Sequence, residues 1–428
     1  MLKQVEGSRA VAEAVALCRP QVICASPVTP QTRIVEALGA MAKSGQLNAG
    51  FLNVESEFAA MSAVIGASAV GARAYTATAS QGLLYVSEAV YNAAGLGLPV
   101  VMTVANRAIG APINVWDDHS DAMSQRDAGW IQLYAETNQE AADLHIQAFR
   151  IAEELSNPVM VCMDGFLLTH ASERVDVPGQ EDVDAFVPPY QPRQVPDPAD
   201  PVSTGAMAGP EAFTEVRFLA YERMRQALDL IPDVAGAFAA RFGRGSGGLV
   251  RPYRIEDAEL IVVALGSVLG TVQDTVDELR DDGTRAGALG LTAFRPFPVQ
   301  AVRAALGGDH RLRRLVVLER ALAPGSGGIL TADLRAAVAA GDGAAPRAED
   351  TIISTVIAGL GGRAVTARSL RRMLGRAAHG ELPPFSFLDL RADLVEAELA
   401  RMRATRRSGP TAENMLRDLG ATASGLGG

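Results

Sequence analysis

The sequence predicts two α/β domains built on parallel sheets, and three observations support this prediction. Short apolar runs alternate with helical patterns from Gln21 to Met163, and the alternation resumes at Leu260. Such alternation is typical of parallel strands covered by helices on both faces. A stretch with eight prolines, Val177–Pro210, separates the two regions. The length of 428 residues agrees with two to three domains.

The first domain is expected over residues 1–176. Its strands are short, mostly apolar runs, which we expect at Gln21–Ala25, Phe51–Val54, Ala74–Thr78, Pro99–Ala105, Ile131–Ala135 and Pro158–Met163. The segments between them have helical patterns, one of them rich in small residues. These helices are expected at Gln31–Lys43, Ser56–Ala72, Gly82–Leu96 and Asn138–Leu155.

Residues 177–250 are expected to form a connection, with the proline-rich stretch followed by a helical segment and a glycine-rich joint. A smaller α/β domain is expected over 251–385. Its strands are predicted at Leu260–Leu265, Ala286–Leu291, Leu315–Leu318 and Ile352–Ala358, and its helices at Val272–Leu279, Val299–Leu306, Ile329–Ala339 and Ala367–Ala378. Residues 386–428 are expected to form a helical tail with a mobile end.

Composition excludes several functions. The formal net charge of −10 argues against nucleic-acid binding, which needs a concentrated basic face. No apolar run approaches the ~18 residues of a membrane span, and Met1–Arg9 has no apolar signal core, so neither a membrane location nor secretion is expected. The three cysteines form no CxxC pair, which excludes an iron–sulfur cluster or structural zinc built from this chain alone. Their odd number fits a reducing cytoplasm.

Two segments at strand ends lack the features of nucleotide-binding motifs. Thr76–Gly82 (TATASQG) leads from a strand into a helix, and its hydroxyls and backbone N–H groups could hold an anion or a ring edge. It has no P-loop lysine, so nucleoside triphosphate binding is not expected. Gly359–Gly362 (GLGG) is glycine-rich but lacks the strand–GxGxxG–helix context of a dinucleotide site.

Candidate site residues follow the first two predicted strands. Thr29 lies in Pro-Val-Thr-Pro, where a stiff turn could fix its hydroxyl, or where it could simply cap a helix that starts at Pro30. Glu55 and Glu57 precede an alanine-rich helix. A glutamate there could cap the helix, whose N-terminus favours a carboxylate, or it could share a proton with a ligand nitrogen in a packed interface.

The richest polar segment is Asn106–Trp130, a long loop of the kind that more often binds than packs. Arg107 ends a strand, where its guanidinium suits a substrate carboxylate. Four residues of the loop could be read as metal ligands, but their crowding favours turn and capping bonds, so no metal site is expected. These four are Asp117, Asp118, His119 and Asp121.

Long segments in a fixed order resemble the alpha subunit of 2-oxoacid:ferredoxin oxidoreductases, and most of all pyruvate:ferredoxin oxidoreductase. The segments are SPVTPQTRIVE, NVESEFAAMSAVIGA, TATASQGLLYVSEAVYNAAGLGLPVVMTVANRAIGAPINVWDDHSD, QRDAGWIQLYAE and NPVMVCMDGF, followed by EDAELIVVALGS and FRPFP. The resemblance covers most of residues 5–365. It implies a pyrimidine-type thiamine-diphosphate-binding domain followed by a smaller, transketolase-C-terminal-like domain.

The resemblance also implies a reaction and partners. A 2-oxoacid, pyruvate in the nearest family member, is oxidatively decarboxylated with coenzyme A to acetyl-CoA and CO₂, reversibly, and the electrons pass to ferredoxin. Thiamine diphosphate is shared with a beta subunit that binds its diphosphate and Mg²⁺. The [4Fe–4S] clusters belong to partner chains, among them gamma and ferredoxin-like delta subunits, and this chain binds no metal.

Three residues match family site residues. Glu57 matches the glutamate that contacts N1′ of the aminopyrimidine, and Thr29 and Arg107 match residues beside the substrate carboxylate. Thr29 is also expected to contact the cofactor. The first motif departs from the family pattern, because Ser26 replaces a tyrosine and Val28 an isoleucine, which could alter the pocket wall.

Alternatives to this interpretation are the same machinery acting on a branched-chain, aromatic or dicarboxylic 2-oxoacid, or with another acceptor such as NAD. A third alternative is a non-catalytic scaffold subunit. The retention of Thr29, Glu57 and Arg107 argues against a scaffold, which needs none of them. The residues do not decide between the 2-oxoacids.

Overall fold

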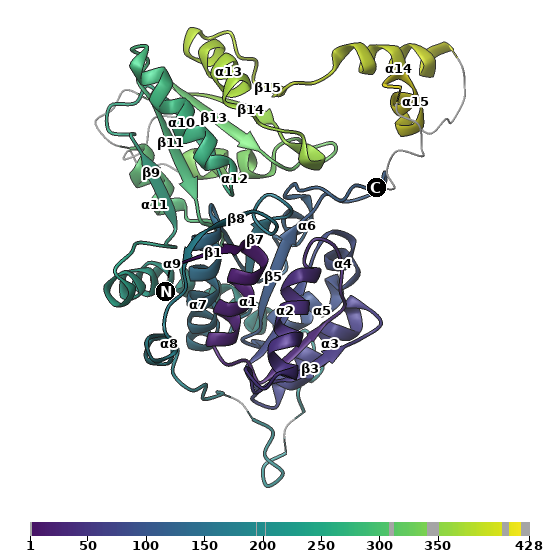
Figure 1. The fold of residues 1–428 in the computed structure, drawn as a ribbon, viewed down its shortest axis with the longest axis vertical. Helices are drawn as coiled ribbons and strands as arrows, with labels where there is room; N and C mark the ends of the chain where they lie inside the picture. Colours follow the sequence, from purple (N-terminus) through teal and green to yellow (C-terminus); the bar gives the residue numbers. More distant parts are fainter. Residues whose placement is uncertain are drawn as a thin grey trace.

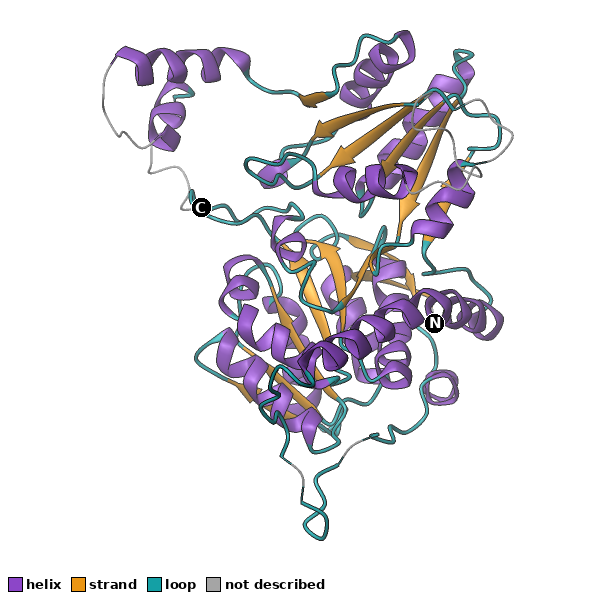
Figure 2. Ribbon diagram, turned by 180° about the vertical axis from the view of Figure 1, so that it is seen from behind, coloured by secondary structure: helices purple, strands orange, loops and turns teal. Residues whose placement is uncertain are grey.

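The computed structural model describes residues 2–193, 195–201, 203–307, 312–339, 351–404 and 411–420. Figure 1 shows two α/β units, one above the other, with a pair of helices standing away from both. A seven-stranded sheet forms the core of the lower unit and a six-stranded sheet that of the upper unit (Figure 2). This confirms the predicted fold class of two α/β units with mainly parallel sheets.

The seven-stranded sheet has the order β12-β6-β7-β5-β4-β2-β3. Six of its strands are parallel, and their central members are buried on both faces, so each reads as a nearly continuous apolar run. These strands are β2 (Val22–Ala25), β3 (Gly50–Asn53), β4 (Ala74–Thr78), β5 (Val101–Asn106), β6 (Ile131–Tyr134) and β7 (Val159–Asp164). The seventh strand, β12 (Ala293–Arg295), comes from the second half of the chain and runs antiparallel to β6.

Helices cover both faces of this sheet, because successive side chains of a strand point to opposite faces. In β7, Val159, Val161 and Met163 pack on one side, and Met160 and Cys162 on the other. The first side is covered by α1 (Gly7–Leu17), α2 (Thr32–Lys43) and α7 (Asn138–Leu155), and the second by α3 (Glu57–Ala69), α5 (Ser87–Leu96) and the short α6 (Ser120–Ser124).

The strand order reverses at β2, which lies between β3 on one side and β4 on the other. Open α/β sheets bind ligands outside the carboxyl ends of the strands at such a switch point. The loops that follow β2, β3, β4 and β5 meet at this edge.

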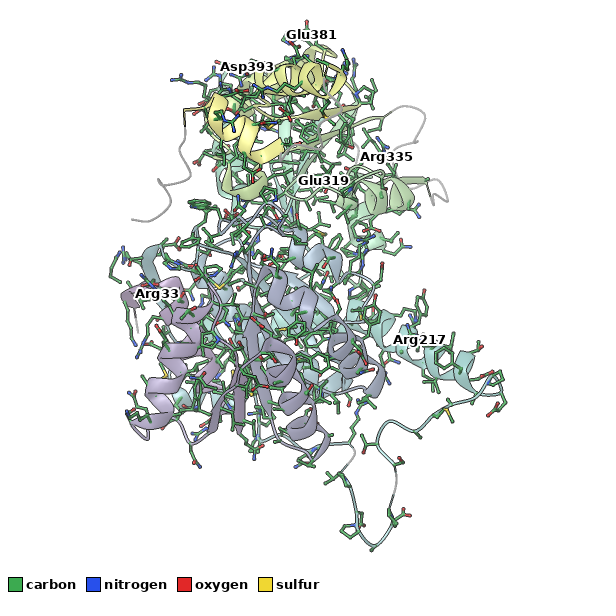
Figure 3. All side chains as sticks on the ribbon, turned by 90° about the vertical axis from the view of Figure 1, so that its right-hand side faces the viewer. Arg33, Arg217, Glu319, Arg335, Glu381 and Asp393 are labelled. Carbon is green, nitrogen blue, oxygen red and sulfur yellow. The ribbon has the colours of Figure 1, made fainter. Side chains whose placement is uncertain are left out.

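Further regular structure lies just before the predicted connection and within it. A two-stranded antiparallel sheet joins β1 (Leu2–Glu6) to β8 (Ser172–Asp176), and α8 (Gln180–Phe186) follows. The long α9 (Phe213–Phe242) packs its second half on the first unit, while its first half projects, as Arg217 marks in Figure 3.

In the tail, α14 (Ala392–Ala404) and α15 (Thr411–Asp418) are helical as expected, and residues 421–428 lie outside the described residues.

The six-stranded sheet has the order β15-β14-β13-β10-β11-β9, with only β9 antiparallel to its neighbour. Its strands are β9 (Val250–Tyr253), β10 (Leu260–Ala264), β11 (Ala286–Leu291), β13 (Arg314–Glu319), β14 (Ile352–Ile357) and β15 (Phe385–Phe387). One face is covered by α10 (Val268–Asp281) and α13 (Ala367–His379), and the other by α11 (Val299–Leu306) and α12 (Ile329–Ala339). The α11–α12 side shares one apolar cluster with the first unit.

Some sequence predictions were wrong in detail. The single helix predicted over Gly82–Leu96 is two helices, α4 (Ser80–Tyr85) and α5, with Val86 between them. The sequence pattern also gave no sign of β1, β8, β9, β12 or β15, which are short or pair across long stretches of chain. The single-turn η1 (Leu360–Gly362) occupies the GLGG segment after β14.

Within the described residues, no helix is long and apolar enough to cross a bilayer. Cys18, Cys24 and Cys162 are all buried, and none of them forms a disulfide.

An ion network centred on Asp164, the last residue of β7, joins the two units. Its Oδ2 accepts hydrogen bonds from Arg320 Nη1 at 2.8 Å and from the backbone N–H of Ser267 at 3.0 Å, both in the second unit. Its Oδ1 lies 2.7 Å from Nε2 of His119, and Arg320 Nη2 donates to Asp117. The side chains of Asp117, His119, Asp164 and Arg320 are buried.

Burial alone would raise the pKa of the Asp164 carboxyl, but Arg320 and His119 hold that pKa well below its usual range. A buried carboxylate is stable only when a cation or several hydrogen-bond donors compensate for its lost hydration, and for Asp164 both Arg320 and the N–H of Ser267 come from the second unit. The charge of Asp164 therefore requires the second unit to be in place.

Replacing Arg320→Met should lower the free energy of unfolding by about 3–5 kcal/mol at neutral pH, because the carboxylates of Asp164 and Asp117 lose their buried cation. The difference in unfolding free energy between wild type and variant should become smaller as the pH falls towards about 4. In the variant, burial without a cation raises the folded-state pKa of these carboxyls above their unfolded value. As the pH falls, the folded variant therefore binds protons before the unfolded chain does, and this stabilises the folded state. Denaturant unfolding at several pH values measures the effect.

The matched control is Arg285→Met. Arg285 pairs with Glu259 at the surface, where the loss of an ion pair changes stability by about 0–1 kcal/mol. Equal losses in the two variants would contradict a special role for the buried network.

Candidate functional site

The three predicted site residues follow three different strands at the switch-point edge. Thr29 follows β2, Glu57 follows β3 and begins α3, and Arg107 comes directly after β5. The parallel register of these strands brings the residues to the same edge of the sheet.

Thr29 does not cap a helix. The helix α2 begins at Thr32, two residues later than the capping interpretation requires, and its N-cap residue is Gln31. Thr29 is exposed, and its backbone oxygen accepts a hydrogen bond from Arg107 Nη1 at 3.0 Å. Thr29 and Arg107 are therefore direct neighbours.

Glu57 is not the cap of its helix either. Ser56 caps α3, because its Oγ accepts the backbone N–H of Ala59 at 3.2 Å. The half-buried Glu57 carboxylate lies in the first turn, where the helix dipole favours a negative charge, and no described residue forms a hydrogen bond or ion pair with it. Glu55, two residues earlier, is exposed.

The first turn of α4 packs closely against Glu57. A Cβ atom at Gly82 would lie 2.9 Å from Cγ and 3.0 Å from Oε1 of Glu57, so only glycine fits without a shift. The same Cβ would lie 2.7 Å from Oγ1 of Thr78, a buried hydroxyl with no hydrogen-bond partner in the described structure. An unpaired carboxylate and an unpaired hydroxyl thus both lie against Gly82, and together they are the acceptor and donor types that a polar ring edge needs.

The Arg107 guanidinium is held by two backbone carbonyls. Its Nε donates to the oxygen of Asn114 at 2.8 Å and its Nη1 to that of Thr29 at 3.0 Å, while Nη2 has no hydrogen-bond partner within the described ranges. Burial lowers the pKa of Arg107 and the Asp121 carboxylate opposes this effect, but arginine stays charged at neutral pH. A fixed guanidinium with free N–H groups can bind a carboxylate.

The acidic loop residues do not converge on a metal site. The described residues contain no group of three or more histidine, cysteine or carboxylate side chains that could hold a metal ion. Asp117 and His119 belong to the ion network, and Asp118 accepts the backbone N–H groups of Ser120 and Gly361. The expectation that these loop residues make turn and capping bonds is therefore correct only in part, because most of their hydrogen-bond partners are distant in the sequence.

Sequence reasoning missed Gln31. It is fully buried, and its amide nitrogen donates to the backbone oxygens of Ser26 at 2.8 Å and Ala77 at 3.1 Å, so it joins the ends of β2 and β4. A polar residue directly after the Pro-Val-Thr-Pro turn was the available signal, but its burial depends on the neighbouring strand.

Beside Glu57, α3, α4 and α5 present exposed apolar side chains, which we call the α3–α5 face. The ring of Phe58 lies 6.1 Å from that of Tyr85, which is 61% exposed. Apart from Glu57, α3 contains no charged residue, yet much of its surface is open. Exposed apolar surface of this kind marks interaction sites. Its members are Phe58, Leu84, Tyr85 and Tyr91.

Comparison with known proteins identifies both units. Residues 13–235 match the family model described as pyruvate flavodoxin/ferredoxin oxidoreductase, thiamine diphosphate-binding, and residues 258–370 match the model of pyruvate:ferredoxin oxidoreductase core domain II. The chain is 45% identical over 399 residues to pyruvate synthase subunit PorA of Methanosarcina barkeri, covering 91% of this chain and 97% of that subunit. It is 40% identical over 370 residues to ketoisovalerate oxidoreductase subunit VorA of Pyrococcus abyssi, covering 86% and 91% of the two chains.

Solved structures agree on the fold. A 2-oxoglutarate:ferredoxin oxidoreductase from Magnetococcus marinus superposes with a TM-score of 0.68 at 19% identity, over 88% of this chain and 65% of that one. A split-gene transketolase superposes with a TM-score of 0.51 at 13% identity, over 88% and 99% of the two chains. The expected likeness to transketolase is thus confirmed at the level of the fold. With both of its units matched in order, the chain belongs to the pyruvate:ferredoxin oxidoreductase family.

Proposed function

We propose that this chain is the alpha-type subunit of a pyruvate synthase that converts pyruvate and coenzyme A reversibly to acetyl-CoA and CO₂, with electrons passing to ferredoxin. The observation that carries the proposal is the meeting of three elements at one switch point: an unpaired carboxylate on Glu57, the exposed Thr29, and Arg107 held by two backbone carbonyls. Membership of the family and near full-length similarity to pyruvate synthase subunits support it.

In this proposal Glu57 shares a proton with N1′ of the aminopyrimidine of thiamine diphosphate. The fit rests on the unpaired Glu57 carboxylate and the unpaired Oγ1 of Thr78, which both lie against Gly82 and provide an acceptor and a donor for a polar ring edge. When bound, thiamine diphosphate supplies the carbon nucleophile that attacks the 2-oxoacid carbonyl. The chain's own contribution is a proton held at a fixed position, which is general acid–base catalysis.

Arg107 and Thr29 bind the carboxylate of the 2-oxoacid. The two backbone hydrogen bonds of Arg107 fix the guanidinium before substrate arrives, so little side-chain freedom is lost on binding. The Thr29 hydroxyl adds a neutral donor next to this charge.

The remaining parts of the complex are assigned to partner chains. We propose that a beta subunit covers the α3–α5 face and binds the diphosphate and Mg²⁺, and that gamma and delta subunits carry the [4Fe–4S] clusters. The exposed rings of Phe58 and Tyr85 beside Glu57 support a partner at this position.

The 40% identity to a ketoisovalerate oxidoreductase subunit favours one alternative substrate class, branched-chain 2-oxoacids. An anaerobic assay of the co-purified complex with coenzyme A, a viologen acceptor and a panel of 2-oxoacids separates the two. The highest kcat/KM is expected for pyruvate, and a preference for 3-methyl-2-oxobutanoate would assign the chain to the alternative.

Glu57→Gln should slow deprotonation of thiamine C2 at least about 10²-fold, because glutamine keeps the size but cannot share the proton. Cofactor binding and assembly should survive. Exchange of the C2 proton with deuterium, followed by NMR, measures the step, and 2-oxoacid-dependent viologen reduction should fall in parallel.

The control for this experiment is Glu55→Gln, which should leave exchange nearly intact because Glu55 is exposed at the end of β3. Slow exchange in Glu55→Gln but not in Glu57→Gln would assign the proton-sharing role to Glu55 instead of Glu57. Normal exchange in both variants would remove this chain from cofactor activation.

Arg107→Ala should raise KM for pyruvate and lower kcat/KM roughly 30- to 700-fold. This corresponds to a loss of about 2–4 kcal/mol of transition-state stabilisation, because a charge-assisted contact is removed. Thiamine diphosphate affinity should stay near normal. Thr29→Ala should have a smaller effect of the same kind. Steady-state kinetics of the complex test this, and an unchanged kcat/KM in Arg107→Ala would exclude the substrate role.

Tyr85→Glu should weaken assembly with the beta subunit by at least about tenfold in Kd, because a charge replaces the most exposed side chain of the α3–α5 face. Tyr85→Phe keeps the ring and should assemble normally. Size-exclusion chromatography of the co-expressed chains gives the result. A wild-type chain that binds thiamine diphosphate as a stable monomer would contradict the partner requirement.

A further inference from the structure

Asp121 is a fully buried carboxylate at which the ends of two strands meet. Its Oδ2 accepts the backbone N–H groups of Ser80 and Arg107, both at 2.9 Å, and its Oδ1 accepts Nδ2 of Asn106 at 2.9 Å and the backbone N–H of Ala122 at 2.7 Å. Both oxygens are thus occupied by two donors each. No described lysine or arginine side chain forms an ion pair with Asp121.

The donors belong to the two halves of the site. Ser80 begins α4 with a φ of +50°, an unusual conformation for a residue with a side chain, and two residues later Gly82 packs against Glu57. Arg107 follows β5 and reaches Thr29. The Asp121 carboxylate therefore accepts hydrogen bonds from the backbone at the start of α4 and from the backbone of Arg107 itself, so it lies between the two halves of the site.

We propose that Asp121 is a positioning residue of the 2-oxoacid site, which sets Arg107 in its orientation relative to Glu57. The inference rests on the proposed function and adds a residue that contacts neither substrate nor cofactor. Its effect on catalysis passes through Arg107.

The carboxylate form is needed for this arrangement. Four N–H groups converge on two oxygens, and an asparagine amide offers only one oxygen, so its NH₂ group would face two donors. Buried donors that lose their acceptor are costly, and the backbone would move to relieve them.

The surroundings favour a negative charge only moderately. Burial raises the pKa of Asp121 to about 6, although the four hydrogen bonds favour the charged form. The titratable groups that face it are Arg107, Tyr134 and Cys162; burial raises the pKa values of the tyrosine and the cysteine well above their usual ranges, so both are neutral. Arg107 is the one charged group among them.

A double-mutant cycle on the assembled complex tests the proposal with Asp121→Asn, Arg107→Ala and their combination. Asp121→Asn should raise KM for pyruvate and lower kcat/KM roughly 10- to 100-fold when Arg107 is present, but less than about threefold in the Arg107→Ala background. The affinity for oxamate, a non-reacting carboxylate analogue of pyruvate, should fall by a similar factor in calorimetry. Thiamine diphosphate affinity should stay within about threefold.

Two further variants complete the design. Asp127→Asn changes an exposed carboxylate six residues away and should be silent. If Asp121→Asn does not assemble, Asn106→Ala removes one donor and keeps the charge, and its smaller loss of kcat/KM should likewise disappear in the Arg107→Ala background.

The outcomes separate this inference from the proposed function. A normal kcat/KM in Arg107→Ala overturns both. A strong effect of Arg107→Ala, combined with an Asp121→Asn or Asn106→Ala effect that is absent or equally large in both backgrounds, overturns the positioning role alone.

Discussion

A buried charge is costly unless a counter-charge or several hydrogen-bond donors compensate for its lost hydration, and for Asp164 the pairing with Arg320 supplies the counter-charge. Because Asp164 ends β7 and Arg320 directly follows β13, the carboxyl ends of the two sheets must face each other. The loop between Arg107 and Asp121 lies in this junction. Asp118 accepts the N–H of Gly361 and Asn114 donates to its oxygen, so the second unit holds the loop that carries the arginine.

Three carboxylates at this edge differ in how many hydrogen-bond donors or cations they bind within the described structure. Asp164 has a cation, Asp121 has four N–H donors, and Glu57 has no described partner. Saturated carboxylates fix the backbone, because every displacement breaks a buried hydrogen bond. The unsaturated one keeps its capacity for a ligand. Rigid surroundings and one unsatisfied group are what a pre-organised binding site requires.

Local signals predicted much of the fold. The strand predicted over Ala74–Thr78 and the helix predicted over Asn138–Leu155 coincide with β4 and α7, because a short, mostly apolar run and a long helical pattern are both local signals. The pairing of β1 with β8 joins residues about 170 positions apart and left no comparable pattern. Thr29, Glu57 and Arg107 were identified through family motifs at strand ends. The roles of Asp117 and Asp121 in bonding depend on distant donors such as Arg320 and Ser80, which no local spacing reveals.

The strand β12 connects the two units more tightly than a linker would. It comes from the second half of the chain, yet it completes the sheet of the first by pairing with β6, whose residues are all buried. Residues 13–235 expressed alone would leave β6 as an uncovered apolar edge, with open N–H and C=O groups that invite pairing with another chain. The family boundary in the sequence is therefore not a boundary at which the protein can be cut.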